Sequence, residues 1–451
     1  MTFTRRTILC TVPSELRRLQ AGRARCVQTQ EQPGGSTMDQ PPARPGATLE
    51  RLHASRREFL TRIAQASAAL GGSAIAGSAV AQAPADAGAG IPNATIMAGK
   101  DSVLAIHSER PLTASVPAEH HNFLVTPTRR MFVRNNLNTP DVDASKHVLT
   151  VRGLVDRELT LTLDDLRKMN VWEQQAMLEC AGSGRTAFRP TPRGTTWSET
   201  GGMGCPKWTG VSLAEILRMA GVRNGAVHVA FFGVDRGPLP TIPPVVRSIP
   251  MAKAMERHTM IATGMNGETL TPVHGAPMRS LVPGWVGSAS IKWVTAIEVL
   301  PAPFKGTYMD DSYRIPGTPV SPGDKMPADA ISTEDWPVKS MITFPGPNAR
   351  YRRGQVVPIE GRAWVGESSI RRVDLSFDEG VTWQRASLDR RGDRYAWRRF
   401  SLDYFPEKSG YQTVLARATD DRGNVQPFLP AWNPLGYYWN GVHRVGFTVE
   451  A

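Results

Sequence analysis

The segment VDLSFDEGVTW, residues 373–383, alternates apolar and polar side chains on both sides of a short turn. Val373, Leu375 and Phe377 precede the turn and Trp383 follows it, which is typical of a β-hairpin with one buried face. Short strands of this kind continue toward the C-terminus at fairly regular intervals. They predict an all-β sandwich of the immunoglobulin type.

Toward the N-terminus, beyond a Pro- and Gly-rich connector, strands and helices are mixed. Thr162 precedes acidic residues, which predicts a helix that begins there. The other expected elements are a helix at residues 211–217 and strands at residues 148–151, 227–232, 291–299 and 413–419. The predicted fold is an α+β domain at residues 82–315 followed by the immunoglobulin-like sandwich at residues 316–451.

The composition is that of a globular protein of several folding units. The 451 residues are 41% hydrophobic and 21% charged, with a net charge of +12. Such a charge invites a nucleic-acid-binding interpretation. Half of it lies in residues 1–81, which hold eleven arginines, no lysine and five acidic residues. The surplus of positive charge in the rest of the chain is modest, and this argues against a nucleic-acid partner.

Residues 1–81 are expected to be an N-terminal extension with an export signal. Arg56-Arg57 precede a weakly apolar, Ala/Gly-rich run, and Ala79-Val80-Ala81 ends that run with small residues. Paired arginines in this position are typical of the twin-arginine signal, which exports folded proteins to the bacterial periplasm. The run is too weakly apolar for a membrane anchor. The mature chain is expected to begin near Gln82, and Met38 is a plausible true start.

The four cysteines are Cys10, Cys26, Cys180 and Cys205, and their spacing fits neither a zinc ribbon nor c-type haem attachment. Cys180 lies in the stretch LECAGSGR, residues 178–185, and further arginines follow it. Nearby positive charge favours a thiolate, which suits metal ligation. The alternative is a buried free cysteine beside a surface arginine cluster. Cys205 is interpreted as a small buried residue.

A longer pattern supports the metal interpretation. It consists of VTP at 125–127, FVRNN at 132–136, the Cys180 stretch, SIP at 248–250, VPGWVG at 282–287 and IKW at 291–293. In this order and spacing, the blocks resemble the sulfite oxidase family of molybdopterin enzymes. The resemblance extends from about residue 108 to the C-terminus.

The resemblance implies a role for individual residues. Cys180 is expected to be the molybdenum ligand. The expected catalytic residues are Arg134, Arg185, Trp197, Tyr313 and Arg444, so the sandwich would contribute to the site. The expected cofactor-binding residues are Phe132, Val133, Arg134, Asn135, Asn136, Asp235, His274, Arg279, Ser290, Ile291 and Lys292.

Three of these residues have a structural alternative. Tyr313 could anchor a Pro-rich linker, Trp197 could belong to the core, and His274 could be a turn residue. Two departures from the family pattern also matter: Asn136 stands where many members have histidine, and Ser183-Gly184 replaces a common Asn-Arg pair. Asparagine does not titrate near neutral pH, so the pH profile is open.

The resemblance implies oxidation of sulfite to sulfate by a molybdenum–molybdopterin enzyme. The chain has no haem motif, so the electrons are expected to go to a separate c-type cytochrome. A homodimer, or a heterodimer with a haem subunit, is plausible. One alternative is a sulfane dehydrogenase subunit of a thiosulfate-oxidising system, although the arginine set favours free sulfite. Another is a different molybdopterin oxidoreductase that acts on a small sulfur oxyanion. Outside enzymes, the alternative is an exported anion-binding protein.

Overall fold

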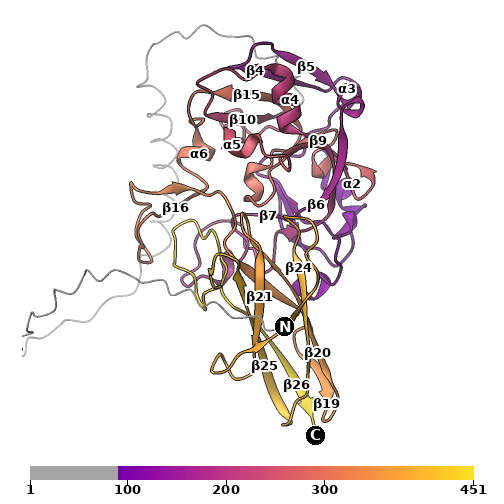
Figure 1. Ribbon diagram of the computed structural model, residues 1–451, viewed down its shortest axis with the longest axis vertical. Coiled ribbons are helices and arrows are strands. Elements are labelled where there is room, and N and C mark those ends of the chain that lie inside the picture. The colour runs from indigo at the N-terminus through magenta and orange to yellow at the C-terminus, as the bar shows by residue number, and fades with distance from the viewer. Residues whose placement is uncertain (1–89) are drawn as a thin grey trace, which may run out of the picture. The chain divides into compact units, whose positions relative to one another are not determined.

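The computed structural model describes residues 90–451. They fall within one compact unit of the chain, Ala81–Ala451 (Figure 1). The predicted leader, its twin-arginine signal, its cleavage site and Cys10 and Cys26 lie outside the described residues.

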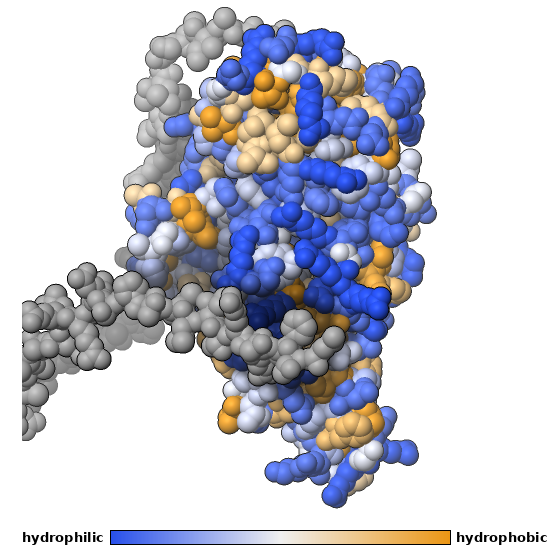
Figure 2. Space-filling model, in the orientation of Figure 1, coloured by the Kyte–Doolittle hydropathy of each residue, from blue (hydrophilic) through white to orange (hydrophobic). Residues whose placement is uncertain are grey.

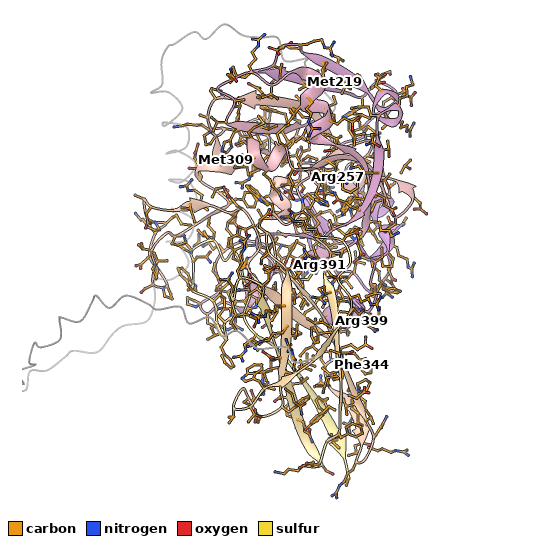
Figure 3. The ribbon with its side chains drawn as sticks, in the orientation of Figure 1. Met219, Arg257, Met309, Phe344, Arg391 and Arg399 are labelled. Carbon is orange, nitrogen blue, oxygen red and sulfur yellow. The ribbon has the colours of Figure 1, made fainter. Side chains whose placement is uncertain are left out.

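The first large sheet has the strand order β11-β10-β15-β4-β5. Its strands are β4 (Val148–Gly153), β5 (Leu159–Thr162), β10 (His228–Gly233), β11 (Val246–Pro250) and β15 (Val294–Leu300). Strands β15 and β4 pair in parallel, and the other neighbours pair antiparallel. The buried side chains of these strands share one apolar core with helix α4 (Leu213–Ala220). On α4 this face includes Leu213, Ile216 and Leu217, whereas Met219 is exposed (Figure 3).

The second large sheet has the order β13-β12-β9-β6, with β14 paired to β12. Its strands are β6 (Val171–Gln175), β9 (Lys207–Ser212), β12 (Met260–Met265), β13 (Glu268–Thr269) and β14 (Arg279–Leu281). Smaller sheets are formed by β1 (Ala105–Glu109), β2 (Leu112–Ser115) and β3 (Val133–Arg134), by β7 (Leu178–Glu179) and β8 (Met203–Gly204), and by β16 (Arg314–Ile315) and β17 (Ile331–Ser332).

The remaining helices are short. The α-helices are α2 (Asn93–Met97), α3 (Leu163–Lys168), α5 (Met251–Ala254) and α6 (Thr307–Asp310), and the 3₁₀ turns are η1 (Ala118–His120), η2 (Thr128–Arg130), η3 (Arg185–Ala187), η4 (Pro272–His274) and η5 (Gly287–Ala289). Helix α3 begins at the predicted place because Thr162 caps it. The Thr162 hydroxyl accepts from Asp165 N, and the Asp165 carboxylate accepts from Thr162 N, which makes a capping box.

The C-terminal strands, orange to yellow in Figure 1, form two sheets around a second apolar core. One sheet contains β18 (Lys339–Phe344), β20 (Val357–Trp364), β23 (Ser387–Leu388) and β24 (Arg398–Tyr404); the other contains β19 (Ala349–Arg352), β21 (Ile370–Ser376), β22 (Gln384–Arg385), β25 (Gly410–Asp420) and β26 (His443–Glu450). The predicted hairpin is present, because β21 pairs with β22 across the turn. The predicted order, an α+β part followed by a sandwich, is confirmed. These two sheets are called the sandwich below.

Two predicted elements are wrong at their edges. Residues 211–212 belong to β9, and the helix begins only at Leu213. Residues 291–293 do not join β15, since Trp293 has a φ of 50°, in the left-handed region.

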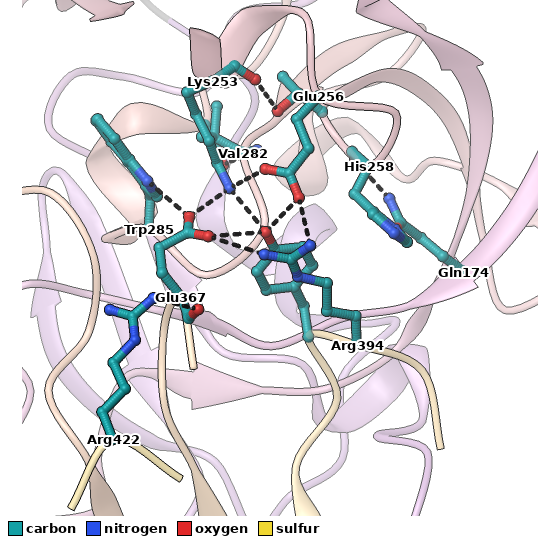
Figure 4. A network of polar contacts seen from close by, with 12 residues as sticks. Gln174, Lys253, Glu256, His258, Val282, Trp285, Glu367, Arg394 and Arg422 are labelled. Carbon is teal, nitrogen blue, oxygen red and sulfur yellow. Dashed lines mark hydrogen bonds and ion pairs between the residues drawn. The ribbon is translucent and has the colours of Figure 1, made fainter. Parts of the chain in front are cut away.

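A polar network joins the sandwich to the preceding part of the chain (Figure 4). Lys253 Nζ lies 2.7 Å from Glu256 Oε2 and 2.6 Å from Glu367 Oε1. Trp285 donates its indole N–H to Glu367, and Arg394 pairs with both carboxylates. Because Lys253 is only 7% exposed, these bonds hold the two parts together in a partly dry environment.

The face of the molecule shown in Figure 2 is mostly hydrophilic, with apolar side chains in separate groups. Within the described residues, no helix is both long enough and apolar enough to span a bilayer.

Candidate functional site

A cavity lies in the part of the chain before the sandwich. Its walls come from residues 131–136, 178–180, 273–279 and 287–293, with Tyr313 at one side. Segments that are far apart in the sequence therefore meet at one place.

The turn after η4 brings two walls of the cavity together. Gly275 has a φ of 101°, and an added Cβ there would lie 3.0 Å from Lys292 Cβ. A side chain at this position would be both strained and crowded. Glycine therefore allows His274 and Lys292 to approach the same space.

Cationic side chains gather at this end of the cavity. Arg279 donates to the carbonyls of His274 and Ser290, each at 3.1 Å, and Lys292 Nζ donates to Val273 O at 2.9 Å and to the Asn135 side chain. Burial lowers the pKa of Arg279 to about 9. Burial, reinforced by Arg279, also holds the pKa of Lys292 well below its usual range.

Lys100 adds another cation beside this group. Its Nζ donates to Thr128 O at 3.0 Å and to Met131 O at 3.1 Å, and it contacts His274 Nε2. Burial lowers the pKa of Lys100 to about 7. Burial, together with Lys100, also lowers the pKa of His274 well below its usual value.

Asp235 is the one carboxylate among the residues that line the cavity. Burial raises its pKa to about 6, although Lys292 opposes that shift. Ser288 Oγ is buried with no hydrogen-bond partner among the described residues, and Ser288 lines the cavity. An excess of desolvated cations beside an unpaired hydroxyl is chemically suited to a bound anion such as a phosphate.

A hydrogen-bonded chain crosses the side of the cavity nearest Tyr313. Arg134 donates to Asn136 Oδ1 at 2.6 Å and to the carbonyl of Asn135. Asn136 Nδ2 lies 3.0 Å from the Tyr313 hydroxyl. The guanidinium of Arg134 and the phenol of Tyr313 are thereby connected through one amide.

Cys180 follows β7 and lines the same cavity. Its N–H donates to Gly202 O at 2.9 Å, and its carbonyl accepts from Ser183 N at 2.8 Å, which fixes the turn that carries the thiol. Cys180 is partly exposed, whereas Cys205 is fully buried, and both are free. Burial raises the pKa of Cys205 to about 12, so that thiol stays protonated, as expected of a packing residue.

Arg185 lies beside the Cys180 turn without lining the cavity. Its Nε donates to Leu435 O and its Nη1 to Thr195 O, each at 3.0 Å. An added Cβ at Gly182 would lie 2.5 Å from Arg185 Nη2, so the guanidinium packs directly against the turn. The carbonyl of Leu435 comes from the loop that precedes β26, so the sandwich does reach this site.

The structure gathers most of the predicted site residues around the cavity. Those that line it are Phe132, Arg134, Asn135, Asn136, Cys180, Asp235, His274, Arg279, Ser290, Ile291, Lys292 and Tyr313. Val133 does not, because successive side chains of a strand point to opposite faces and Val133 packs into an apolar cluster with Val273. Trp197 is fully buried in the same apolar cluster as Cys180, and its ring contacts His107 at a centroid distance of 4.9 Å. Its indole Nε1 has no hydrogen-bond partner among the described residues, so both the site role and the core alternative stay predictions.

Arg444 was predicted to line the anion pocket, and the structure corrects this. Along β26 exposure alternates, so His443 is buried and Arg444 points outward. Arg444 Nη2 lies 2.7 Å from Glu379 Oε1, in an ion pair whose side chains are 51% and 54% exposed. The sandwich contributes Leu435 and Tyr437 to the surroundings of Arg185 instead.

Sequence reasoning missed Lys100, Ser288 and Tyr437. Lys100 lies before the region of resemblance and has no motif. Ser288 directly follows the VPGWVG block. Tyr437 follows a glycine in an aromatic loop, and its ring lies 5.4 Å from Arg185 Cζ and stacks on Tyr313 at 5.5 Å.

Two families match the chain in consecutive ranges. Residues 136–308 match the family "Oxidoreductase molybdopterin binding domain". Residues 330–450 match the family "Mo-co oxidoreductase dimerisation domain". The first range includes the cavity walls from Asn136 onward, and the second includes the sandwich.

Curated relatives carry the name sulfite oxidase. The Gallus gallus protein is 34% identical over 76% of this chain and 77% of its own length, and the Arabidopsis thaliana protein is 31% identical over 76% and 93%. Mitochondrial sulfite oxidase of Homo sapiens is 35% identical, and this chain spans 66% of its length. Among solved structures, the sulfane dehydrogenase SoxCD of Paracoccus pantotrophus matches with a TM-score of 0.66 and 26% identity, over 83% of this chain and 96% of that chain.

Proposed function

Because this chain belongs to the sulfite oxidase family of molybdopterin-binding proteins, we propose that it oxidises sulfite to sulfate at a molybdenum centre whose protein ligand is Cys180. The observation that carries the proposal is the cavity, where Cys180, Arg134 and Tyr313 lie at the edge of a space lined by desolvated cations.

The residues present fit a molybdopterin. Arg279, Lys292 and His274 would hold its phosphate, since a bound anion restores the charge that burial disfavours. The orphaned Ser288 Oγ belongs to a residue that lines the same cavity and offers a hydrogen bond to the cofactor. When bound, molybdenum supplies two-electron redox and oxygen-transfer chemistry, and the protein supplies orientation and charge.

The protein's own groups would bind and orient the substrate. Sulfite is a small divalent anion, and guanidiniums bind such oxyanions well. Arg134, which lines the cavity, and Arg185, which packs against the Cys180 turn, would supply them. Tyr313 would hydrogen-bond within the pocket, with Asn136 holding its hydroxyl. In the overall reaction, sulfite gains an oxygen from water and releases two electrons and two protons.

The electrons need an acceptor, and we propose a separate c-type cytochrome that takes them one at a time. The match of residues 330–450 to a dimerisation domain supports a homodimer. A heterodimer with a haem subunit is the alternative assembly that we propose. Failure of purified periplasmic cytochrome c to be reduced by sulfite and enzyme would contradict this acceptor.

The central test is sulfite-dependent reduction of cytochrome c or ferricyanide by protein matured in a molybdenum-replete host. Molybdenum content near one per chain is expected in the wild type. Cys180→Ser should lose activity, whereas the matched variant Cys205→Ser should keep it, because Cys205 is buried away from the cavity. Full activity of Cys180→Ser would refute the ligand assignment, and a metal-free wild type that only binds sulfite would indicate an anion-binding protein.

A second candidate is oxidation of a protein-bound sulfane, the activity named for the solved neighbour. Arg444 lies outside the cavity, so the full arginine set no longer favours free sulfite. Kinetics with sulfite and with a persulfidated carrier peptide would separate the two substrates.

For the cellular location, we propose export to the periplasm by the twin-arginine route, with cleavage after Ala81. Paired arginines and a small-residue cleavage site support it. N-terminal sequencing of the mature protein tests the cleavage site, and a twin-lysine variant that is still exported would contradict the route.

A further inference from the structure

The loop between β25 and β26 brings Tyr437 to the Cys180 turn. The backbone of Tyr437 is clamped by Asn433, whose side chain donates to Tyr437 O at 2.9 Å and accepts from Tyr437 N at 3.0 Å. The next residue, Tyr438, donates its N–H to Ala181 O at 3.0 Å. Tyr437 is therefore fixed next to the residue that follows Cys180.

The ring of Tyr437 lies between two residues of the proposed substrate site. Its centroid is 5.5 Å from that of Tyr313, with 13° between the ring planes, and Arg185 Cζ lies 5.4 Å from the same centroid. Tyr437 is 8% exposed and does not line the cavity. It contacts Arg185 and Tyr313 without itself lining the cavity.

We propose that Tyr437 is a positioning residue that sets the placement of Arg185 and Tyr313 through the face of its ring, and thereby the affinity of the site for a small oxyanion. The proposal rests on the proposed function of the site.

The surroundings of Tyr313 and Arg185 explain why these two side chains need a residue that positions them. Tyr313 has a φ of 55°, a left-handed conformation that a bulky side chain rarely adopts and that its surroundings must hold. Thr333 N donates to Tyr313 O at 2.7 Å, and the stack on Tyr437 holds the ring. Arg185 has two nitrogens bound to carbonyls, and the Tyr437 ring adds a contact to the guanidinium.

The face of the Tyr437 ring is the group expected to attract the Arg185 guanidinium. Burial raises the pKa of Tyr437, with Tyr313 reinforcing the shift, so its hydroxyl stays neutral. A neutral phenol attracts a guanidinium through its π electrons. The Tyr437 hydroxyl also contacts the backbone of Tyr313. Phenylalanine should lose only that contact, whereas an aliphatic residue should lose the ring face as well.

The experiment compares Tyr437→Phe and Tyr437→Leu in the holoenzyme. The readouts are kcat and KM for sulfite and, without turnover, the Kd of the product sulfate by calorimetry. Tyr437→Leu should raise both KM and Kd about threefold to tenfold, as expected for one lost cation–π contact, with a smaller effect on kcat. Tyr437→Phe should stay within about twofold of the wild type.

The matched control is Tyr404→Leu, which removes a stacked tyrosine from the sandwich, where Tyr404 lies 3.7 Å from the ring of Phe377. It should leave KM and Kd unchanged. Wild-type KM and Kd in Tyr437→Leu would overturn the proposal, as would equal defects in the phenylalanine and leucine variants.

A series of fluorinated phenylalanines at position 437 keeps the test decisive if the leucine variant does not fold. Added fluorine withdraws π density while the ring shape is nearly kept, so the sulfate Kd should rise with each fluorine. A sulfate Kd that does not change across the fluorinated variants would overturn the role of Tyr437. A wild type without sulfite oxidation in the same assay would instead contradict the proposed function, so the two failures are distinguishable.

Discussion

Glu179 and Lys339 form an ion pair that is almost completely shielded from solvent. Lys339 Nζ lies 2.8 Å from Glu179 Oε1, and the side chains are 3% and 0% exposed. The other carboxylate oxygen accepts from the indole N–H of Trp364 at 2.7 Å. Glu179 directly precedes Cys180, whereas Lys339 and Trp364 belong to the sandwich. The sandwich therefore contacts, through buried polar groups, the residue that precedes the proposed metal ligand.

Replacing one member of this pair should destabilise the protein strongly. Lys339→Met leaves the Glu179 carboxylate buried without its cation, which costs about 3–5 kcal/mol. The double variant Glu179→Gln, Lys339→Met should regain most of that loss, since no buried charge remains. Urea denaturation of the cofactor-free protein measures the free energy of unfolding of the single and the double variant.

The exposed pair of Arg350 and Glu450, with side chains 73% and 48% exposed, is the control. Arg350→Met should change the stability by less than about 1 kcal/mol. A loss of similar size in Lys339→Met would mean that the buried pair is not important for stability.

Lys100 should make the stability of the cofactor-free protein depend on pH. Burial lowers its pKa to about 7 from the ordinary lysine value of 10.5. Between these values the unfolded chain binds a proton that the folded chain lacks, so stability rises with pH in this window, by up to about 1.4 kcal/mol per unit. Below pH 7 both states are protonated and the full cost of burying the charge remains.

Lys100→Met should lower this slope by the contribution of one proton, while buried Lys292 keeps a contribution of its own. Denaturation at several pH values from 6 to 10 measures the difference. Lys146, whose side chain is 85% exposed, provides the control Lys146→Met. An unchanged slope in Lys100→Met would show that Lys100 is not desolvated in the folded state.

The cavity walls could be predicted because short motifs carry them, as the FVRNN block does for Arg134 and Asn136. Lys100 and Tyr437 could not, since their approach to the site depends on how distant segments pack. Arg444 was misplaced because the sequence HR at 443–444 does not say which residue of a strand faces inward. The pairing of β26 with β25 decides that point, and it turns His443 inward.

Because asparagine does not titrate near neutral pH, Asn136 should add no inflection to the pH profile of kcat/KM for sulfite. Asn136→His would place an imidazole between Arg134 and Tyr313, where the guanidinium disfavours its protonated form. We expect a new inflection in kcat/KM for sulfite below the ordinary histidine pKa of about 6.5. Asn136→Ser, which removes the amide without adding a titrating group, should show no such inflection. Identical profiles for the histidine and serine variants would contradict the prediction.

Arg444 should be dispensable for substrate binding. Its guanidinium is paired with Glu379 on the surface of the sandwich, so Arg444→Ala removes an exposed ion pair that is worth less than about 1 kcal/mol. The KM for sulfite should stay within about twofold of the wild-type value, since loss of an exposed charge pair changes little. Arg185→Met should raise KM by about tenfold or more, because it removes a guanidinium packed against the Cys180 turn. Steady-state kinetics of the two variants at equal molybdenum content measures the contrast, and a large rise in KM for Arg444→Ala would return Arg444 to the substrate site.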